Sequence, residues 1–153
     1  MRSRETTAAS GLEAFLDAVG LGPVQLVAHS WGGKIALALA ARHGVSIGAH
    51  PAYPDLVGFG RRPMQLSADE IIANLHYQVA ALEGMARSQQ LELSYVKPHG
   101  ALYNDMMARE EVRNAILEAL AEYHRPLALM MQATPAAGEH RREADLAGVE
   151  VWF

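Results

Sequence analysis

The feature that most constrains the fold is a regular alternation between short apolar runs and longer segments with helical spacing. Five runs have the length and composition of strands: residues 24–28, 45–49, 93–97, 127–131 and 149–153. Strands that alternate with helices form a parallel sheet with right-handed crossovers. We predict one α/β domain over residues 1–153. Because a closed eight-stranded barrel takes about 250 residues, the sheet is expected to be an incomplete β/α barrel or an open three-layer sheet.

Local signals mark several helix boundaries between these runs. Gly20 can close a helix over residues 12–19, and Gly44 can close the helix that begins near residue 32. Ser67 and Glu70 form a capping box, which predicts that a third helix begins there. A fourth helical pattern spans residues 109–123.

Composition narrows the classes of function. The chain has 153 residues and a formal net charge of −4, and it lacks a basic cluster, so nucleic acid is not an expected partner. Without cysteine, disulfides, zinc–cysteine sites and thiol nucleophiles are excluded. No apolar run approaches the roughly 20 residues that a membrane helix needs, and the first residues do not have the pattern of a secretory signal. We expect a cytoplasmic protein that does not bind membranes.

Polar side chains follow the predicted strands at their carboxyl ends, where parallel α/β folds bind ligands. If the strands are parallel neighbours, these side chains share one rim and form one site. The side chains are His29, Ser30, His50, Asp55, Lys97, His99, Tyr103, Asn104, Gln132 and Thr134.

The stretch VKPHGALYN, residues 96–104, carries the pair Lys97 and His99. A lysine at a strand end can hold a carboxylate or phosphate, or polarise a carbonyl. A histidine can move protons near neutral pH or bind a metal. The alternative is structural: Lys97 extends along the surface, and His99 bonds a backbone carbonyl. With His50 on the adjacent strand end, we favour a functional role.

The stretch GAHPAYPDLVGFGRR, residues 48–62, is a second polar patch on a long loop, and loops of this length are often functional. His50 and Asp55 could ligate a divalent metal of unknown identity, or act as a base and its orienting group. Tyr53 and Arg61 offer further contacts to a substrate. The alternative is a surface loop with an ordinary turn.

The stretch VAHSWGGKIALALA, residues 27–40, has the layout of a nucleophile elbow: a strand, a small-His-Ser-Trp-Gly-Gly turn and a helix. Ser30 would be the nucleophile, and the backbone N–H of Trp31 would help to form an oxyanion hole. The reaction would also need a later acid and a later histidine. The alternative is a structural turn without catalytic partners.

Three motifs resemble the LamB/YcsF family, the A subunit of the bacterial 5-oxoprolinase, over residues 44–153: GVSIGAHPAYPDLVGFGRR, MQLSADEI and YVKPHGALYND. The resemblance implies a modified β/α barrel that opens 5-oxoproline to L-glutamate with partner subunits B and C, coupled to ATP hydrolysis. It also implies catalytic roles for His50, Asp55, Lys97 and His99. Tyr103 and Asn104 would bind the substrate, together with Tyr53 and Arg61.

Residues 11–43 look instead like the nucleophile-elbow segment of an α/β-hydrolase, so the chain is expected to be a chimera joined near residues 40–44. The opening motifs of the LamB/YcsF family, of the types DLNxDxGE and ANIACGFHAGD, are not found, and neither are strands beyond residues 149–153. We therefore expect a shortened or chimeric form of reduced or no activity. A serine hydrolase using Ser30, or an inactive scaffold that self-associates through its sheet edges, are the alternatives.

Overall fold

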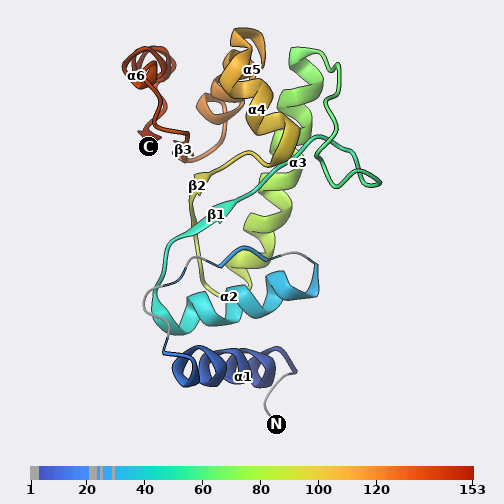
Figure 1. Cartoon of the computed structure of the whole chain (residues 1–153), viewed down its shortest axis with the longest axis vertical. Helices are drawn as coiled ribbons and strands as arrows, with labels where there is room; N and C mark the ends of the chain where they lie inside the picture. The colour runs from blue at the N-terminus through green and yellow to red at the C-terminus, as the bar shows by residue number, and fades with distance from the viewer. Residues whose placement is uncertain (1–3, 21–23, 25, 29) are drawn as a thin grey trace. The chain divides into compact units, whose positions relative to one another are not determined.

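The computed structural model describes residues 4–20, 24, 26–28 and 30–153. They form two compact units, a helical unit and a sheet unit (Figure 1). The helical unit comprises the described residues up to Ser46 together with Met85–Glu92. The sheet unit comprises Ile47–Gly84 and Leu93–Phe153.

The helical unit is built mainly on two helices, α1 (Arg4–Ala18) and α2 (Trp31–His43). As predicted, α2 ends at Gly44, which has a left-handed φ of 61° and donates its N–H to the Ala40 carbonyl over 2.9 Å. Helix α1 begins at Arg4, whereas the apolar spacing predicted a helix over residues 12–19. The buried apolar residues of the two helices are few: Ala9, Leu37, Leu39 and Ala40.

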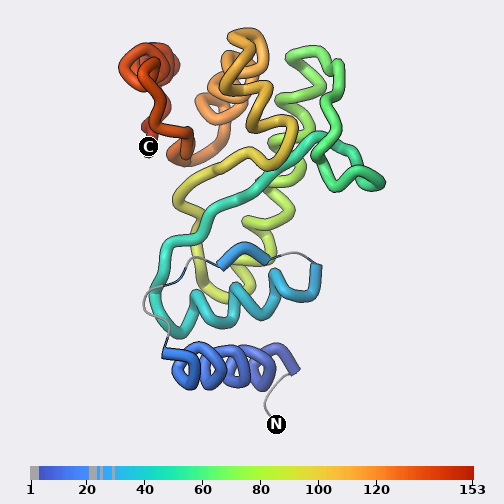
Figure 2. The backbone as a smooth tube through the Cα atoms, viewed as in Figure 1, coloured from blue at the N-terminus to red at the C-terminus, as the bar shows by residue number. Residues whose placement is uncertain are grey.

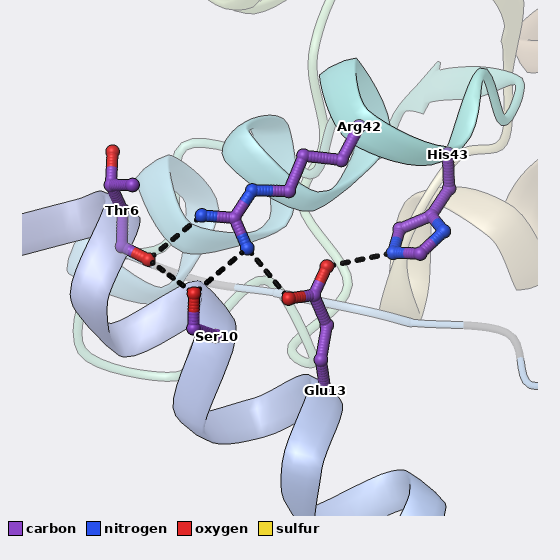
Figure 3. A network of polar contacts seen from close by, with 5 residues as sticks. All are labelled: Thr6, Ser10, Glu13, Arg42 and His43. Atoms are coloured by element: carbon purple, nitrogen blue, oxygen red, sulfur yellow. Dashed lines mark hydrogen bonds and ion pairs between the residues drawn. The ribbon is translucent and has the colours of Figure 1, made fainter.

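A polar network joins one face of α1 to the last turn of α2 (Figure 3). The Arg42 guanidinium donates to Glu13 over 2.6 Å, to the Ser10 hydroxyl over 3.1 Å and to the Thr6 carbonyl over 2.9 Å. His43 lies 2.7 Å from the other Glu13 oxygen. Hydrogen bonding to His43, followed by the proximity of Arg42, lowers the pKa of Glu13.

The predicted strand at residues 24–28 is wrong for its described residues. Residues 24 and 26–28 have neither strand nor helix structure, while Gln25 and His29 lie outside the described residues. Val24, Leu26 and Val27 are exposed by 47%, 49% and 78%. A strand needs a neighbour for its backbone hydrogen bonds, and no described strand pairs with this run.

The sheet unit contains four strands in the order β1-β2-β3-β4, and all neighbours are parallel in the part of the chain that is described. Their bounds are β1 (Ile47–Ala49), β2 (Leu93–Val96), β3 (Ala128–Met130) and β4 (Val151–Trp152). The prediction of a parallel sheet is confirmed. Strand order that follows chain order is the arrangement of a β/α barrel wall, whereas doubly wound sheets reverse their order.

Helices connect successive strands: α3 (Ala68–Arg87), α4 (Gly100–Ala108) with α5 (Glu110–Ala121), and α6 (Ala137–Leu146). The predicted capping box is confirmed, since the Ser67 N–H donates to Glu70 over 2.8 Å and the Glu70 N–H donates to Ser67 over 3.3 Å. Helices α4 and α6 had not been predicted. No helix among the described residues has the length and apolar character needed to cross a membrane.

The core of the sheet unit lies between the strands and their helices. Its largest fully buried side chains are Leu75 and Val79 of α3, Leu93 and Val96 of β2, Met106 of α4, Val112 and Ile116 of α5 and Leu129 of β3. Burying each large apolar side chain contributes about 1.5–3 kcal/mol. This packing provides a stable base for the loops that follow β1 and β2, which run side by side in Figure 2.

Candidate functional site

Pairing between β1 and β2 continues beyond the ends of both strands. The Lys97 N–H donates to the Ala49 carbonyl over 2.9 Å, and the His99 N–H donates to the Pro51 carbonyl over 2.8 Å. The segments that leave the two strands therefore stay in register. As a result, His50 and His99 lie next to each other at the carboxyl ends of the strands, as the predicted rim requires.

His50 and His99, here called the histidine pair, contact each other directly. His99 Nδ1 lies 3.1 Å from His50 Nε2, and the rings meet edge to face with centroids 4.8 Å apart. His50 Nδ1 lies 2.6 Å from the Lys97 carbonyl oxygen, and His99 Nε2 lies 3.0 Å from that of Phe59. Partial burial lowers the pKa of His50; its bond to the Lys97 carbonyl opposes this effect, and the nearby charges of His99 and Lys97 add to it.

A hollow of about 430 Å³ opens at this rim, and we call it the rim pocket. It is lined by His50, Lys97, Pro98, Gly100, Tyr103, Asn104 and Gln132. Five of the side chains predicted at the rim are therefore brought together: His50, Lys97, Tyr103, Asn104 and, from the segment after β3, Gln132. Burial raises the pKa of Tyr103, so its phenol stays protonated and can donate a hydrogen bond.

Asp55 does not pair with His50. Its carboxylate is held by the Arg62 guanidinium and accepts the Gly58 N–H over 2.9 Å. Hydrogen bonding to Arg62 is the main cause that lowers the pKa of Asp55 to about 2. Asp55 thus organises the loop between β1 and α3. Arg62 was missed as its partner, although the Arg61-Arg62 dipeptide stood close by on the same loop.

Tyr53 and Arg61 do not line the rim pocket. Tyr53 is buried, and its hydroxyl donates to Asp105 over 2.7 Å. Burial, reinforced by this bond, raises its pKa far above the usual value. The Arg61 guanidinium carbon lies 5.8 Å from the centre of the Phe59 ring, in cation–π contact. Both residues support the loop rather than the rim pocket.

A second hollow, of about 470 Å³, is formed by the loop itself. Its lining is mostly apolar: Pro54, Leu56, Val57, Pro63 and Met64, with the Asp55–Arg62 ion pair. Because both charged groups bind each other, the described lining of this hollow offers no free acid, base or nucleophile. Catalytic chemistry is better supported by the rim pocket.

The close approach of two loops explains why a glycine follows His99. Gly100 has a φ of +60°, and a Cβ atom there would lie 2.5 Å from the Gly60 carbonyl oxygen. The same carbonyl accepts the Ala101 N–H over 2.9 Å. Only glycine allows this approach, which fastens the β1–α3 loop to the first turn of α4 and keeps the rim pocket in shape.

No group of three or more metal-ligating side chains occurs among the residues that the structure describes. His50 is bonded at both ring nitrogens and Asp55 is bonded to Arg62. Because Asp55 lies with Arg62 rather than with His50, the predicted metal-ligating pair of His50 and Asp55 is not formed.

Ser30 lies in the helical unit at the N-terminus of α2. It is exposed, with φ 56° and ψ −128°, and its side chain makes no capping bond. A non-glycine residue rarely adopts this conformation, which costs about 1–3 kcal/mol. The predicted partner histidine and acid are not identified by any contact of Ser30 in the described residues.

Comparison with known proteins matches residues 34–153 to the model of the LamB/YcsF family. The chain is 51% identical over 117 residues to a 5-oxoprolinase A subunit from Pseudomonas fluorescens, covering 76% of this chain and 47% of the relative. It is 53% identical over 115 residues to a 5-oxoprolinase A subunit from Pseudomonas putida, covering 75% and 45%.

A crystal structure of a lactam utilization protein from Thermus thermophilus matches with a TM-score of 0.69 and 42% identity. It covers 78% of this chain and 48% of that one. The chain spans about half the length of the curated relatives it matches. The family match begins before the predicted start at residue 44 and so takes in most of α2. Because the matched segment contains the whole parallel sheet and the rim pocket, the chain belongs to the LamB/YcsF family.

Proposed function

We propose that this chain provides the lactam-binding part of a 5-oxoprolinase A subunit. The observation that carries the proposal is the rim pocket: it lies at the carboxyl ends of parallel strands and combines Lys97 with neutral donors and acceptors. Relatives that bear the name of 5-oxoprolinase A subunits share about half of the matched residues.

The proposed reaction adds water to the lactam carbonyl of 5-oxoproline. The carbon–nitrogen bond of the ring breaks, and the nitrogen leaves as the amine of L-glutamate. Negative charge develops on the carbonyl oxygen as water adds, and a lysine ammonium can stabilise it. Alternatively, Lys97 holds the substrate carboxylate. Tyr103, Asn104 and Gln132 can orient the ring by hydrogen bonds to its N–H and oxygen atoms.

The proposal places ATP hydrolysis with the complete assembly, including subunits B and C, rather than with the rim pocket. Triphosphates are usually held by several backbone N–H groups and cationic side chains. Among the described residues that line the rim pocket, only Lys97 is a lysine or an arginine. Since the chain matches about half of its relatives' length, we expect little or no turnover from the chain alone. A cytoplasmic location is part of this proposal.

Binding tests this proposal without the remaining subunits. Isothermal titration of the folded chain with 5-oxoproline is expected to show binding, and Lys97→Met is expected to weaken it roughly tenfold or more. Lys34→Met is the matched control, because Lys34 is exposed on α2 in the other unit. Equal binding by both variants and the parent would contradict a role for Lys97, and no binding by the parent would contradict the proposal itself.

A second candidate function uses Ser30 as the nucleophile of a serine hydrolase. The observation that favours it is the strained backbone of Ser30 at the start of α2, followed by Gly32 and Gly33. A sharp strained turn of this kind exposes a serine hydroxyl for attack. This candidate function includes the prediction that the chain is a chimera, in which two parent folds are joined near residues 40–44.

A fluorophosphonate probe tests the second candidate on the folded chain. Labelling that Ser30→Ala abolishes and Ser46→Ala preserves would support it, because Ser46 is an exposed serine of the same unit. If the intact protein is not labelled, Ser30 is a structural turn. The third alternative, self-association through the edge strands β1 and β4, predicts dimers or larger species in analytical ultracentrifugation.

A further inference from the structure

Two side chains that line the rim pocket, Asn104 and Gln132, end in a carboxamide that the fold does not use. Both residues are exposed, and neither makes a hydrogen bond or an ion pair with any other residue that the structure describes. Gln78 shows the contrast, because its carboxamide accepts the Ala52 N–H over 3.0 Å and donates to the Ala52 carbonyl over 2.7 Å. The two carboxamides of the rim pocket therefore keep their donors and acceptors for a ligand.

The ring of a lactam presents a pattern that a carboxamide matches. Ring closure forces the amide into the cis form, so its N–H and its C=O point to the same side, which we call the amide edge. A carboxamide also carries an N–H and a C=O side by side, so the two groups can exchange two hydrogen bonds in one plane. An ordinary peptide bond is trans and has its N–H and C=O on opposite sides, so it cannot be bound in this way.

The other polar side chains of the rim pocket cannot replace a carboxamide. Lys97 has donors only and cannot accept the N–H of a lactam. Tyr103 offers a single oxygen, which cannot pair with the N–H and the C=O side by side. Both ring nitrogens of His50 already lie within hydrogen-bond distance of protein atoms, at 2.6 Å and 3.1 Å. Among the described lining side chains, the amide edge is therefore left to Asn104 or Gln132.

We propose that Gln132 binds the amide edge of a lactam through two hydrogen bonds and is the residue that makes the rim pocket selective for lactams. The N–H of the preceding residue, Met131, donates to the Trp152 carbonyl over 2.8 Å, which holds the backbone up to this point. Strand β3 pairs with β2, whose end carries Lys97, so Gln132 and Lys97 follow neighbouring strands. Asn104 lies within α4, and its side chain is one methylene shorter, which favours Gln132 as the residue that reaches the ring.

This inference deepens the proposed function and rests on it for the choice of 5-oxoproline as the ligand. It holds for either role of Lys97, because Gln132 uses one lone pair of the lactam carbonyl oxygen and leaves the other free. The inference also separates substrate from product. L-glutamate has an ammonium group and a second carboxylate in place of the amide edge, so Gln132 cannot bind it through the same pair of hydrogen bonds.

Lactones provide the test, because they replace the ring N–H by an oxygen atom and keep the size of the ring. NMR titration of the full chain compares 5-oxoproline with its lactone analogue, 5-oxotetrahydrofuran-2-carboxylate, and pyrrolidin-2-one with γ-butyrolactone. In the parent, each lactam should bind roughly tenfold more tightly than its lactone, since the lactone turns a lone pair toward the Gln132 oxygen. Gln132→Met keeps the length of the side chain and should remove this preference. Asn104→Leu should change the binding of lactam and lactone by the same factor, and the control Gln89→Met, at an exposed position in the other unit, should change neither.

The outcomes separate this inference from the proposed function. Loss of the lactam preference in Gln132→Met, but not in Asn104→Leu, supports the inference. If 5-oxoproline binds but the parent does not prefer it to the lactone, or Gln132→Met keeps the preference, the role of Gln132 is overturned and the proposed function stands. A preference for pyrrolidin-2-one that depends on Gln132, without binding of 5-oxoproline, removes the proposed function and supports the role of Gln132. If neither lactam binds, both are overturned.

Discussion

The two units of the chain are each stabilised by a different kind of interaction. In the sheet unit, strands and helices bury a continuous apolar core, and backbone pairing extends into the loops that carry the rim pocket. In the helical unit, α1 and α2 bury few apolar side chains and share a polar network around Arg42 and Glu13. Apolar side chains such as Val27 and Trp31 are largely exposed there. The candidate site therefore lies in the unit whose geometry is better supported by packing.

The largest contrast is expected from one substitution made in each unit. Gly100 and Gly44 have nearly the same φ, +60° and +61°. A Cβ at Gly100 would lie 2.5 Å from the Gly60 carbonyl oxygen, whereas nothing lies within 4 Å of one at Gly44. Gly100→Ala combines left-handed strain with backbone overlap and should lower the free energy of unfolding by about 4 kcal/mol. Gly44→Ala carries the strain alone and should cost about 1 kcal/mol.

Urea unfolding followed by circular dichroism measures both variants. Gly100→Ala should also weaken 5-oxoproline binding, because the Gly60 carbonyl and the first turn of α4 would move apart. An equal loss of stability in the two variants would show that the close approach at Gly100 does not affect the free energy of unfolding.

Core truncation gives the next largest effect. Leu129 is fully buried in β3, and Leu39 of α2 is 9% exposed. Leu129→Ala removes packed methyl groups and should lower the free energy of unfolding by about 3 kcal/mol. Leu39→Ala should lower it by about 2 kcal/mol, because Leu39 is less completely buried. We propose that the chain unfolds as one domain, so both variants should shift a single urea transition. Two separate transitions, each moved by one variant, would instead show that the units unfold independently.

The regular alternation of apolar runs and helices was enough to predict the parallel sheet, and the direction of the strands then predicted the rim. His50 and Lys97 both line the rim pocket because parallel strands end at the same edge. The helix end at Gly44 and the Ser67–Glu70 capping box could also be predicted from the sequence, since each depends on a few neighbouring residues.

Features that depend on distant partners could not be predicted in the same way. Residues 24–28 have the composition of a strand, but composition does not supply a neighbouring strand. Helix α4 was hidden because Pro98 and Gly100 look like breakers, although Gly100 begins the helix by accepting a left-handed φ. Asp55 looked like a partner for His50, and the pairing with Arg62 became apparent only once the loop was folded. The chemical roles of the rim residues remain predictions.

Acid should affect the β1–α3 loop through Asp55. The pKa of this carboxyl is lowered from 3.8 to about 2, so the unfolded chain takes up its proton first as the pH falls. When the pH is above the pKa that Asp55 has in the unfolded chain, the charged carboxylate contributes its full stabilisation to the folded loop. This contribution is lost as the pH falls from about 4 to 2. Hydrogen exchange of residues 54–62 should accelerate across this window beyond its normal pH dependence.

Asp55→Asn should abolish that additional acceleration, since it removes the titrating group. Asp69→Asn, at an exposed position in the first turn of α3, is the control and should preserve it. If the parent and Asp55→Asn respond alike, the Asp55–Arg62 pair does not hold the loop.

The smallest effect is expected from the polar network of the helical unit. Arg42 and Glu13 are partly exposed, with side-chain exposures of 29% and 27%, so water and salt screen their attraction. Arg42→Gln should speed hydrogen exchange in α1 at low salt, and the difference from the parent should shrink in about 1 M NaCl. Exchange in β2 should not change in either condition. If the difference instead persists in high salt, Arg42 contributes through its hydrogen bonds to Thr6 and Ser10 more than through its charge. The two units would then both depend on directional contacts, and the contrast between them would be one of buried apolar area alone.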